Sequence, residues 1–193
     1  KDANLKVEFR DLAFDGLESA LQRSTGDFLI SGMTITGLRG LDVSFTVPYF
    51  LTRTLTLLAK PKADGVTKVD DLNDPSRRIM AKLGTTGEIA ARRRCPKARI
   101  DTLGEDTLCA LEVAQGRADA FIYDEMQIRS YAADHPASAR VLEEEVTVEP
   151  YGIACRKGDV ETVAWLNLEI DLMRRDGRLD ALHKKHFPGQ APA

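Results

Sequence analysis

Apolar and polar side chains alternate along several short stretches of the chain, a period of two that is typical of β-strands with one buried face. Residues 5–9 and 41–45 alternate in this way, and Pro48 ends the second element. Short runs of apolar and β-branched residues bounded by turn-forming residues predict further strands. These runs cover residues 27–31, 51–59, 78–83, 98–103, 118–125 and 151–156, with shorter extended pieces at 140–142 and 146–148.

Apolar residues three and four positions apart predict helices between these strands. The strongest pattern covers residues 160–175, where Leu166 and Ile170 lie on one face. Further helices are predicted at 17–22, 88–94, 106–115, 126–133 and 179–186. Strands that alternate with helices indicate an α/β fold with a mainly parallel sheet. In such a sheet, ligands bind beyond the carboxyl ends of the strands.

The stretch 27–50 carries the first candidate binding chemistry. A predicted interior strand at 27–31 leads into a segment rich in glycine and hydroxyl groups at 31–36, and Arg39 follows. Glycine lets a ligand approach the backbone, hydroxyls donate hydrogen bonds, and a guanidinium holds a carboxylate with two parallel bonds. The segment therefore fits an anion site. A solvated turn after a core strand fits the same residues, and the pattern alone leaves both interpretations open.

Two further strand ends carry polar groups. Residues 84–88 read G-T-T-G-E and precede a predicted helix, so Thr85 or Thr86 is expected to cap it. The free N–H groups at a helix start also suit an anion, although an ordinary capped helix explains the same residues. Asp124 ends the strand at 118–125 and offers a carboxylate to a cation. One positive clamp and one negative anchor are what an α-amino acid zwitterion requires.

Composition narrows the class of protein. The chain has 193 residues, of which 43% are hydrophobic and 30% charged, as expected for one large or two small globular domains. The net charge of −3 gives no reason to expect nucleic-acid binding. No apolar stretch approaches the ~20 residues of a membrane span. No signal peptide stands at the start, so an exported protein would already have lost it.

Cysteine and histidine give no metal or cofactor signal. The three cysteines lie outside any C-x-x-C pattern; Cys155 is expected to be a small buried residue, and pairing of Cys95 with Cys109 stays open. His183 and His186 have the spacing of metal ligands on a helix face, but no third ligand is near in sequence. A solvated or helix-capping role is favoured for both histidines.

The motifs together resemble the family-3 extracellular solute-binding proteins, the periplasmic amino-acid-binding proteins of ABC importers. The similarity covers nearly the whole chain. Gly37 and Leu38 replace the family's usual Pro-Glu before the arginine. The matching segments are S-G-M-T-I-T-G-L-R at 31–39, V-S-F-T-V-P-Y at 43–49, G-T-T-G-E at 84–88, G-R-A-D-A-F-I-Y-D at 116–124, P-Y-G-I-A-C-R-K-G-D at 150–159 and the terminal segment 165–187.

The resemblance implies a two-lobed, type II periplasmic-binding-protein-like clamshell. Lobe 1 would comprise residues 1–53 and 158–193, and lobe 2 residues 54–157, with the hinge near 51–53 and 157–160. Members of the family usually begin with a further strand and helix, and that strand lies in the middle of lobe 1. Lobe 1 is therefore expected to be incomplete at its N-terminus. Because a missing strand leaves backbone groups unpaired, either another chain fills the gap, lobe 1 is rearranged, or the chain is a truncated member that binds poorly. Of these outcomes, we expect association or strand swapping with a second copy of the chain.

The resemblance also implies ligand contacts. Arg39 would bind the α-carboxylate, with Thr34 and the backbone N–H groups of Thr86 and Gly87 as further donors. Asp124 would bind the α-ammonium group.

The remaining implied contacts surround these groups. The carbonyl of Gly32 and Thr34 would help to hold the ammonium group. Phe14 matches the position of an aromatic that stacks on the ligand, and Leu83 and Met33 would flank the side-chain pocket.

The leading functional hypothesis is a periplasmic or extracellular protein that captures a polar amino acid for the permease of an ABC importer, without cofactor or catalytic residue. A ligand-sensing module of the same fold is one alternative. The other is a dehydratase acting on prephenate or arogenate, which needs a general acid. Glu88 and Glu125 are the candidates for that acid near the presumed cleft.

Overall fold

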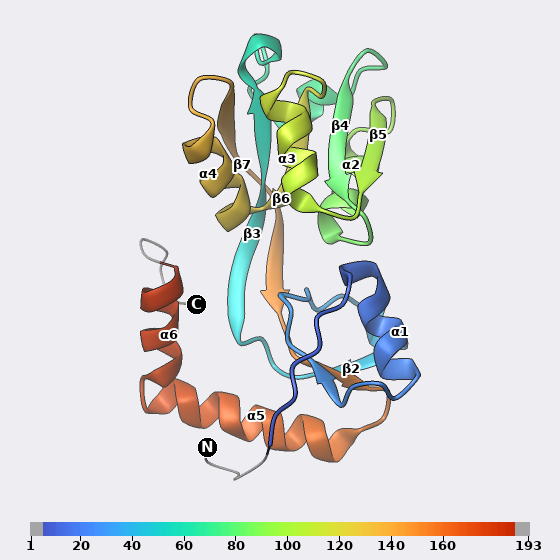
Figure 1. Cartoon of the computed structure of the whole chain (residues 1–193), viewed down its shortest axis with the longest axis vertical. Coiled ribbons are helices and arrows are strands. Elements are labelled where there is room, and N and C mark those ends of the chain that lie inside the picture. Colours follow the sequence, from blue (N-terminus) through green and yellow to red (C-terminus); the bar gives the residue numbers. More distant parts are fainter. Residues whose placement is uncertain (1–5, 188–193) are drawn as a thin grey trace.

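The computed structural model describes residues 6–187, which form two halves around separate β-sheets (Figure 1). The larger sheet has the strand order β5-β4-β6-β3-β7, and the smaller sheet has the order β1-β8-β2. The predicted two-lobed α/β fold is confirmed. The strands are β1 (Phe28–Leu29), β2 (Val43–Phe45), β3 (Phe50–Ala59), β4 (Arg78–Lys82), β5 (Arg99–Leu103), β6 (Ala120–Asp124), β7 (Ala139–Tyr151) and β8 (Ala154–Arg156).

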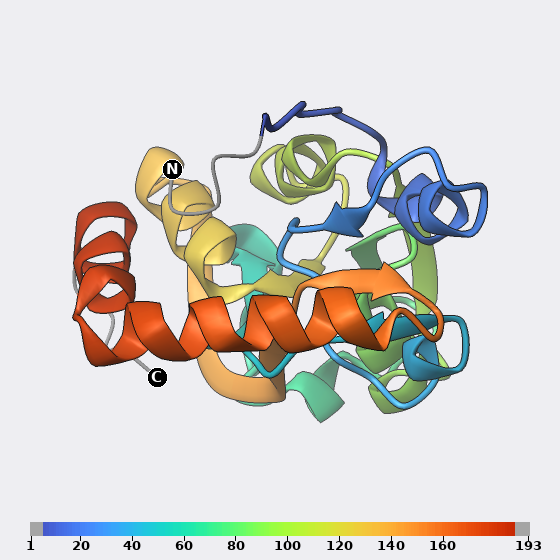
Figure 2. The ribbon, with the colours of Figure 1, turned by 90° about the horizontal axis from the view of Figure 1, so that it is seen from below.

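Helices pack on both sheets, and every predicted helix is present within a few residues of its expected bounds. The larger sheet carries α2 (Thr86–Arg94), α3 (Asp106–Ala114) and α4 (Glu125–Asp134). The smaller sheet carries α1 (Leu17–Gln22) and α5 (Val160–Arg175), and α5 is the long helix in the foreground of Figure 2. Helix α6 (Arg178–His186) turns away from the end of α5. Short 3₁₀ turns occupy Phe14–Gly16, Arg39–Leu41, Lys60–Lys62 and Val69–Leu72.

Two long strands join the halves. Strands β3 and β7 pair antiparallel from Phe50↔Tyr151 to Ala59↔Ala139, and both run from the upper to the lower half in Figure 1. Their register shifts between Thr54 and Thr56. The two extended pieces predicted at 140–142 and 146–148 are parts of this one strand, β7. The glutamates at 143–145 interrupt the apolar pattern, yet the backbone stays extended through them.

The prediction of a mainly parallel sheet is wrong. Strand β4 runs parallel to β5 and β6, but β3 runs antiparallel to both β6 and β7, and every pair in the smaller sheet is antiparallel. Strands β3 and β7 bring the chain into the larger half and back out of it, so they must point in opposite directions. Alternation of strands and helices in the sequence does not reveal this return.

The strand predicted at 5–9 is also wrong over its described part. Residues 6–13 have no regular structure, and Val7 and Phe9 are 60% and 87% exposed. Alternation predicts a half-buried strand only where a neighbouring strand exists, and none pairs with this segment among residues 6–187. Residue 5 lies outside the described residues. The predicted interior strand at 27–31 is the two-residue β1, at the edge of the smaller sheet.

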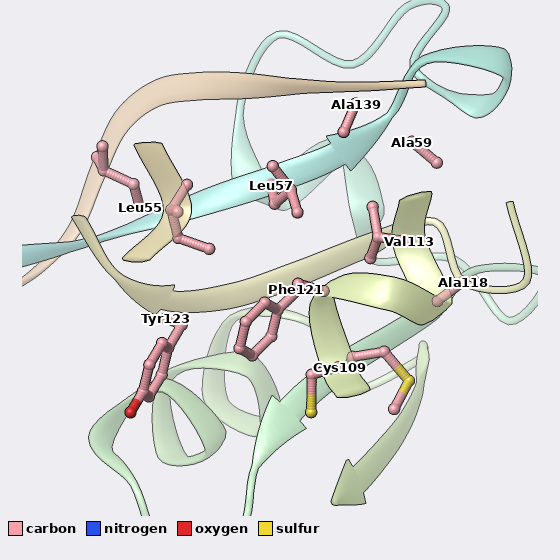
Figure 3. Close-up of a cluster of buried hydrophobic side chains, with 12 residues drawn as sticks. Leu55, Leu57, Ala59, Cys109, Val113, Ala118, Phe121, Tyr123 and Ala139 are labelled. Atoms are coloured by element: carbon pink, nitrogen blue, oxygen red, sulfur yellow. The ribbon is translucent and has the colours of Figure 1, made fainter. Parts of the chain in front are cut away.

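The core lies on both faces of each sheet. One cluster under α3 and α4 centres on Phe121, with Leu55 and Leu57 from β3 (Figure 3). A second cluster on the opposite face includes Ile122 of the same strand. Neighbouring residues of β6 thus face opposite sides, as the period of two requires. In the smaller half, Ala154 packs toward α1 and Cys155 toward α5 in the same way.

The cysteines are all free and buried. Cys95 and Cys109 belong to the two different clusters of the larger half, so the pairing that the sequence left open does not form. Burial raises the pKa of each thiol to about 11, which makes all three poor nucleophiles at neutral pH. No helix within residues 6–187 is both long enough and apolar enough to span a membrane.

Candidate functional site

A cavity of about 550 Å³ lies between the two halves. Both halves contribute to its lining, and α5 and α6 are among the contributing elements. The lining residues are Phe14, Ile30, Ser31, Gly32, Thr34, Arg39, Tyr49, Phe50, Thr85, Thr86, Tyr123, Asp124, Met126, Gln127, Tyr151, Ile153, Ile170, Met173, Leu179, Leu182, His183, His186 and Phe187.

Arg39 is the cationic group of this cavity. It lies in a 3₁₀ turn after β1 and is only 8% exposed. Its Nη1 donates to the Thr34 carbonyl at 3.0 Å, and its Nη2 donates across the cleft to the Gly84 carbonyl at 2.9 Å. Its Nε lies 3.2 Å from Glu18. Desolvation lowers the pKa of Arg39 below its ordinary value, and the negative charge of Glu18 opposes that shift.

Two threonines face the cavity from opposite halves and share a partner. Thr34 Oγ1 donates to Glu149 Oε2 at 2.5 Å, and Thr86 Oγ1 donates to the same oxygen at 2.8 Å. Thr86 begins α2, and Thr85 is its N-cap, accepting a bond from the Glu88 N–H at 3.4 Å. The expected cap is therefore Thr85, which leaves the Thr86 hydroxyl for the cleft.

Asp124 provides a carboxylate at the C-terminal end of β6, where the sequence predicts one. It occupies the N-cap position of α4 but makes no side-chain cap bond. Instead it accepts a short hydrogen bond from the Tyr151 hydroxyl. Desolvation raises the pKa of Asp124 to about 6, and the nearby charge of Glu149 adds to the shift. Such a carboxylate gains from a cationic partner more than an exposed one would.

Aromatic rings frame the charged groups. The ring of Phe14 lies 5.5 Å from the Arg39 guanidinium carbon and 6.0 Å from Lys82 Nζ. Lys82 also donates to Asp106 at 3.0 Å, so its charge is already paired. The hydroxyl of Tyr49 accepts a bond from the Gly32 N–H at 3.3 Å. Gly32 has φ +62°, and a Cβ there would meet the Tyr151 ring at 3.3 Å.

Six of the nine residues implied as ligand contacts line the cavity, namely Phe14, Gly32, Thr34, Arg39, Thr86 and Asp124. Leu83 and Gly87 are not among its lining residues. Leu83 is 40% exposed just beyond β4. Gly87 is buried at the start of α2, where a Cβ would lie 2.6 Å from the Ile122 carbonyl oxygen. Its role in the structure is close packing of α2 onto β6. Met33, the other implied flank of the pocket, is buried in the core of the smaller half.

Sequence reasoning missed Glu149 and Tyr151. Both lie on β7 and, with Thr147, occupy alternate positions that share one face. The signal was present, because a glutamate at an inward position of a strand is unusual unless its carboxylate has partners. The neighbouring acidic run at 143–145 obscured it, since it made Glu149 resemble one more solvated charge.

The described residues contain no group of three or more metal-ligating side chains. The solvated role expected of His183 is wrong, because its ring packs edge-on against Phe50 at 4.9 Å and is 8% exposed. The two glutamates considered as general acids are both paired with arginines. Glu88 binds Arg92, and Glu125 binds Arg53 and Arg129.

Comparison with known proteins identifies the family that the chain matches. Residues 1–189 match the family model described as bacterial extracellular solute-binding proteins, family 3. A probable histidine-binding protein of Neisseria gonorrhoeae is 32% identical over 194 residues, covering 97% of this chain and 70% of that protein. A putative ABC-transporter binding component from Wolinella succinogenes, solved in complex with lysine, superposes with a TM-score of 0.90 at 31% identity over 98% of this chain and 82% of that one.

A second solved structure is an ancestral amino-acid-binding protein described as a precursor of cyclohexadienyl dehydratase. It superposes with a TM-score of 0.88 at 38% identity, covering 96% of this chain and 80% of that chain.

Proposed function

The chain belongs to the bacterial extracellular solute-binding proteins of family 3, and we propose that it captures a polar amino acid outside the cytoplasm and delivers it to the permease of an ABC importer. One observation supports this most directly: a buried arginine and a desolvated carboxylate face the same cavity from opposite halves. This pair of charges complements the two ends of a zwitterion.

Arg39 is proposed to bind the α-carboxylate. A guanidinium has five N–H groups. Its contacts to Thr34, Gly84 and Glu18 use one N–H on each of its three nitrogens. One N–H on each terminal nitrogen has no partner among residues 6–187. A carboxylate that accepts both would form a bidentate pair.

Asp124 is proposed to bind the α-ammonium group. One of its oxygens accepts the Tyr151 hydroxyl, and the other has no hydrogen-bond partner among the described residues. Because desolvation penalises its charged form, an ammonium group at this place replaces lost hydration. The Phe14 ring, over Arg39, would cover one side of the ligand.

The hinge is proposed to lie where β3 and β7 leave the larger half. Lobe 1 then comprises residues 1–53 and 158–193, and lobe 2 residues 54–157. The register shift of β3 against β7 between Thr54 and Thr56 supports this position, because an irregular ladder bends more easily. A ligand that contacts both halves would stabilise the closed arrangement through its higher affinity for that state.

Association with a second copy is proposed from the smaller half. Strand β1 pairs only with β8, and its other edge has no partner among residues 6–187. Phe28 of β1 and the adjacent Ile30 are exposed, as are Val7, Phe9 and Leu12 of the irregular segment 6–13. Light scattering on the purified chain at about 50 μM should give a mass above the 21.3 kDa monomer. A monomer at that concentration would contradict the proposal.

We do not expect the chain to be an enzyme, although one solved neighbour is described as a precursor of cyclohexadienyl dehydratase. The observation that favours catalysis is the raised pKa of Asp124, which suits a general acid. Incubation with prephenate and arogenate separates the two functions. Product formation at a rate that is lost in Asp124→Asn would establish the enzyme instead.

A thermal-shift screen against the twenty L-amino acids tests the binding function. A ligand at a hundred times its Kd stabilises the folded state by about 2.7 kcal/mol. For a chain of this size we expect a rise in Tm of roughly 5–10 °C with at least one polar amino acid. A folded sample that none of the twenty stabilises would contradict the proposed function.

A further inference from the structure

Glu149 is a buried carboxylate at the boundary of the two halves. It lies near the end of β7, is 1% exposed, and accepts hydrogen bonds from the hydroxyls of Thr34, Thr86 and Thr147. No lysine, arginine or histidine forms a salt bridge with it among residues 6–187. Burying an acidic side chain at this place is costly, and three hydroxyl donors offset that cost.

The three donors fix the direction of the hydrogen bonds. Three hydroxyls converge on two carboxylate oxygens, and an ionised carboxylate accepts but does not donate. Each threonine therefore turns its single proton toward Glu149. Thr147 in turn lies 2.7 Å from Thr54 Oγ1, so Thr54 must be the donor of that bond. The network runs from the irregular part of β3 through Glu149 to the cleft.

Thr34 and Thr86 line the cavity, whereas Thr147 and Glu149 are not among its lining residues. A hydroxyl that has donated its only proton presents lone pairs on its other side. Both threonines thus face the cavity as acceptors. Acceptors repel a carboxylate oxygen and bind an ammonium N–H, the same preference that Asp124 has.

We propose that Glu149 is a positioning residue that holds Thr34 and Thr86, one from each half, as acceptors for the ammonium group of the ligand. The inference rests on the proposed amino-acid-binding function and deepens it. Glu149 also couples recognition of the amino group to closure of the cleft. The hydroxyls of Thr34 and Thr86 come from different halves, so both can donate to the same oxygen of Glu149 only when the halves are close together. For Thr34, to which the resemblance assigns contacts with both ends of the ligand, the inference favours the ammonium end.

Glu149→Gln tests the inference because glutamine is nearly isosteric but carries a donor in place of one acceptor. Its NH2 group can face Thr34 and Thr86, where it turns one of their protons toward the cavity, or it can face Thr147. In the second case the neutral oxygen that faces Thr34 and Thr86 holds their protons less strongly than the carboxylate does. The probes are three L-amino acids, each with its analogue lacking the α-amino group: arginine with 5-guanidinopentanoate, lysine with 6-aminohexanoate, and histidine with 3-(imidazol-4-yl)propanoate. The pair whose amino acid binds the unchanged protein most tightly is titrated calorimetrically.

We expect the variant to bind the amino acid about 10- to 100-fold more weakly, as for the loss of a hydrogen bond to a charged group. The affinity for the analogue should stay within about threefold, so the preference for the amino group falls at least about threefold. Equal weakening of both ligands would mean a merely structural role and would overturn the inference. Glu145→Gln, an exposed position on the same strand, is the control and should change neither affinity.

If Glu149→Gln fails to fold, Thr86→Val provides a second test. This variant should fold, because Thr86 is only half-buried at the start of α2 and its hydroxyl does not cap the helix. This variant should show the same fall in preference for the amino group, and an unchanged preference would overturn the inference. If the unchanged protein binds none of the six probes and no other amino acid, the proposed function fails first. If it prefers the amino acid over the analogue and both variants keep that preference, only the inference fails.

Discussion

The charged groups in and around the cavity form two pairs and leave two carboxylates without a cationic partner among residues 6–187. Arg39 is balanced by Glu18, and Lys82 is balanced by Asp106. Asp124 and Glu149 have only hydroxyl donors as hydrogen-bond partners among residues 6–187. These two carboxylates give the surroundings of the cavity an excess of negative charge, which favours a ligand with an ammonium group.

Asp124 should make the ligand-free protein less stable at neutral pH than its asparagine variant. Its pKa of about 6 lies above the ordinary value of 3.8, so the folded state binds this proton more tightly than the unfolded state does. The stability contributed by the proton is present at low pH and is lost as the pH rises through about 6. Asp124→Asn should therefore stabilise the ligand-free protein by roughly 1–2 kcal/mol at pH 7.5, and by much less at pH 4.

Chemical denaturation at the two pH values measures this difference. Asp64→Asn, at an exposed position, is the matched control and should have little effect at either pH. If Asp124→Asn destabilises the protein equally at both pH values, burial does not raise the free energy of the ionised Asp124 carboxylate. Ligand binding should be lost in Asp124→Asn at both pH values.

Sequence reasoning predicted the residues that lie at strand ends better than those inside strands. Arg39, Thr86 and Asp124 follow strands and stand in polar segments, so their exposure to a cleft follows from the general rule for α/β sheets. Glu149 contributes through two other side chains, and its partners are 115 and 63 residues away in sequence. No local pattern encodes contacts of that range.

At the scale of elements, the placement of Thr86 depends on how closely α2 approaches β6. Gly87 permits that approach, because a Cβ would lie 2.6 Å from the Ile122 carbonyl oxygen. A backbone atom cannot move aside without shifting the helix or the strand. We expect Gly87→Ala to cost about 1–3 kcal/mol of stability, as overpacked sites do. It should also weaken ligand binding, because Thr86 moves with the helix.

Gly104→Ala provides the comparison for that variant. A Cβ at Gly104 meets no atom within 4 Å, so this substitution should change stability by no more than about 0.5 kcal/mol. Urea unfolding of the two variants gives the difference directly. Equal stability of the two proteins would contradict the close packing of α2 on β6.

The helices and most strands could be predicted from periodicity, but their pairing could not. Strand β8 lies between β1 and β2 although more than 100 residues separate it from either in sequence. Strand β7 continues through three successive glutamates that no hydrophobic pattern would include. For residues 6–9 the pattern predicts a strand that does not form. Their side chains alternate between apolar and polar, but no strand of the described chain pairs with them.

For the whole molecule, two bridges cross the cleft between the halves. Arg39 donates to Gly84 across it, and Glu149 receives Thr34 from one half and Thr86 from the other. Arg39, Thr34 and Thr86 line the cavity, and Glu149 accepts hydrogen bonds from the two threonines. Closure and ligand binding should therefore depend on the same side chains, which is how a ligand shifts a protein toward its closed state.

Calorimetric titration of the unchanged protein and Arg39→Ala with the best amino acid from the thermal screen tests the central claim most directly. Arg92→Ala, an exposed arginine of α2, serves as the control, and circular dichroism verifies that all three proteins are folded. We predict that Arg39→Ala binds at least about 100-fold more weakly, the loss of a buried bidentate pair, while Arg92→Ala binds normally. Binding by a folded Arg39→Ala within about threefold of the unchanged protein would contradict the account.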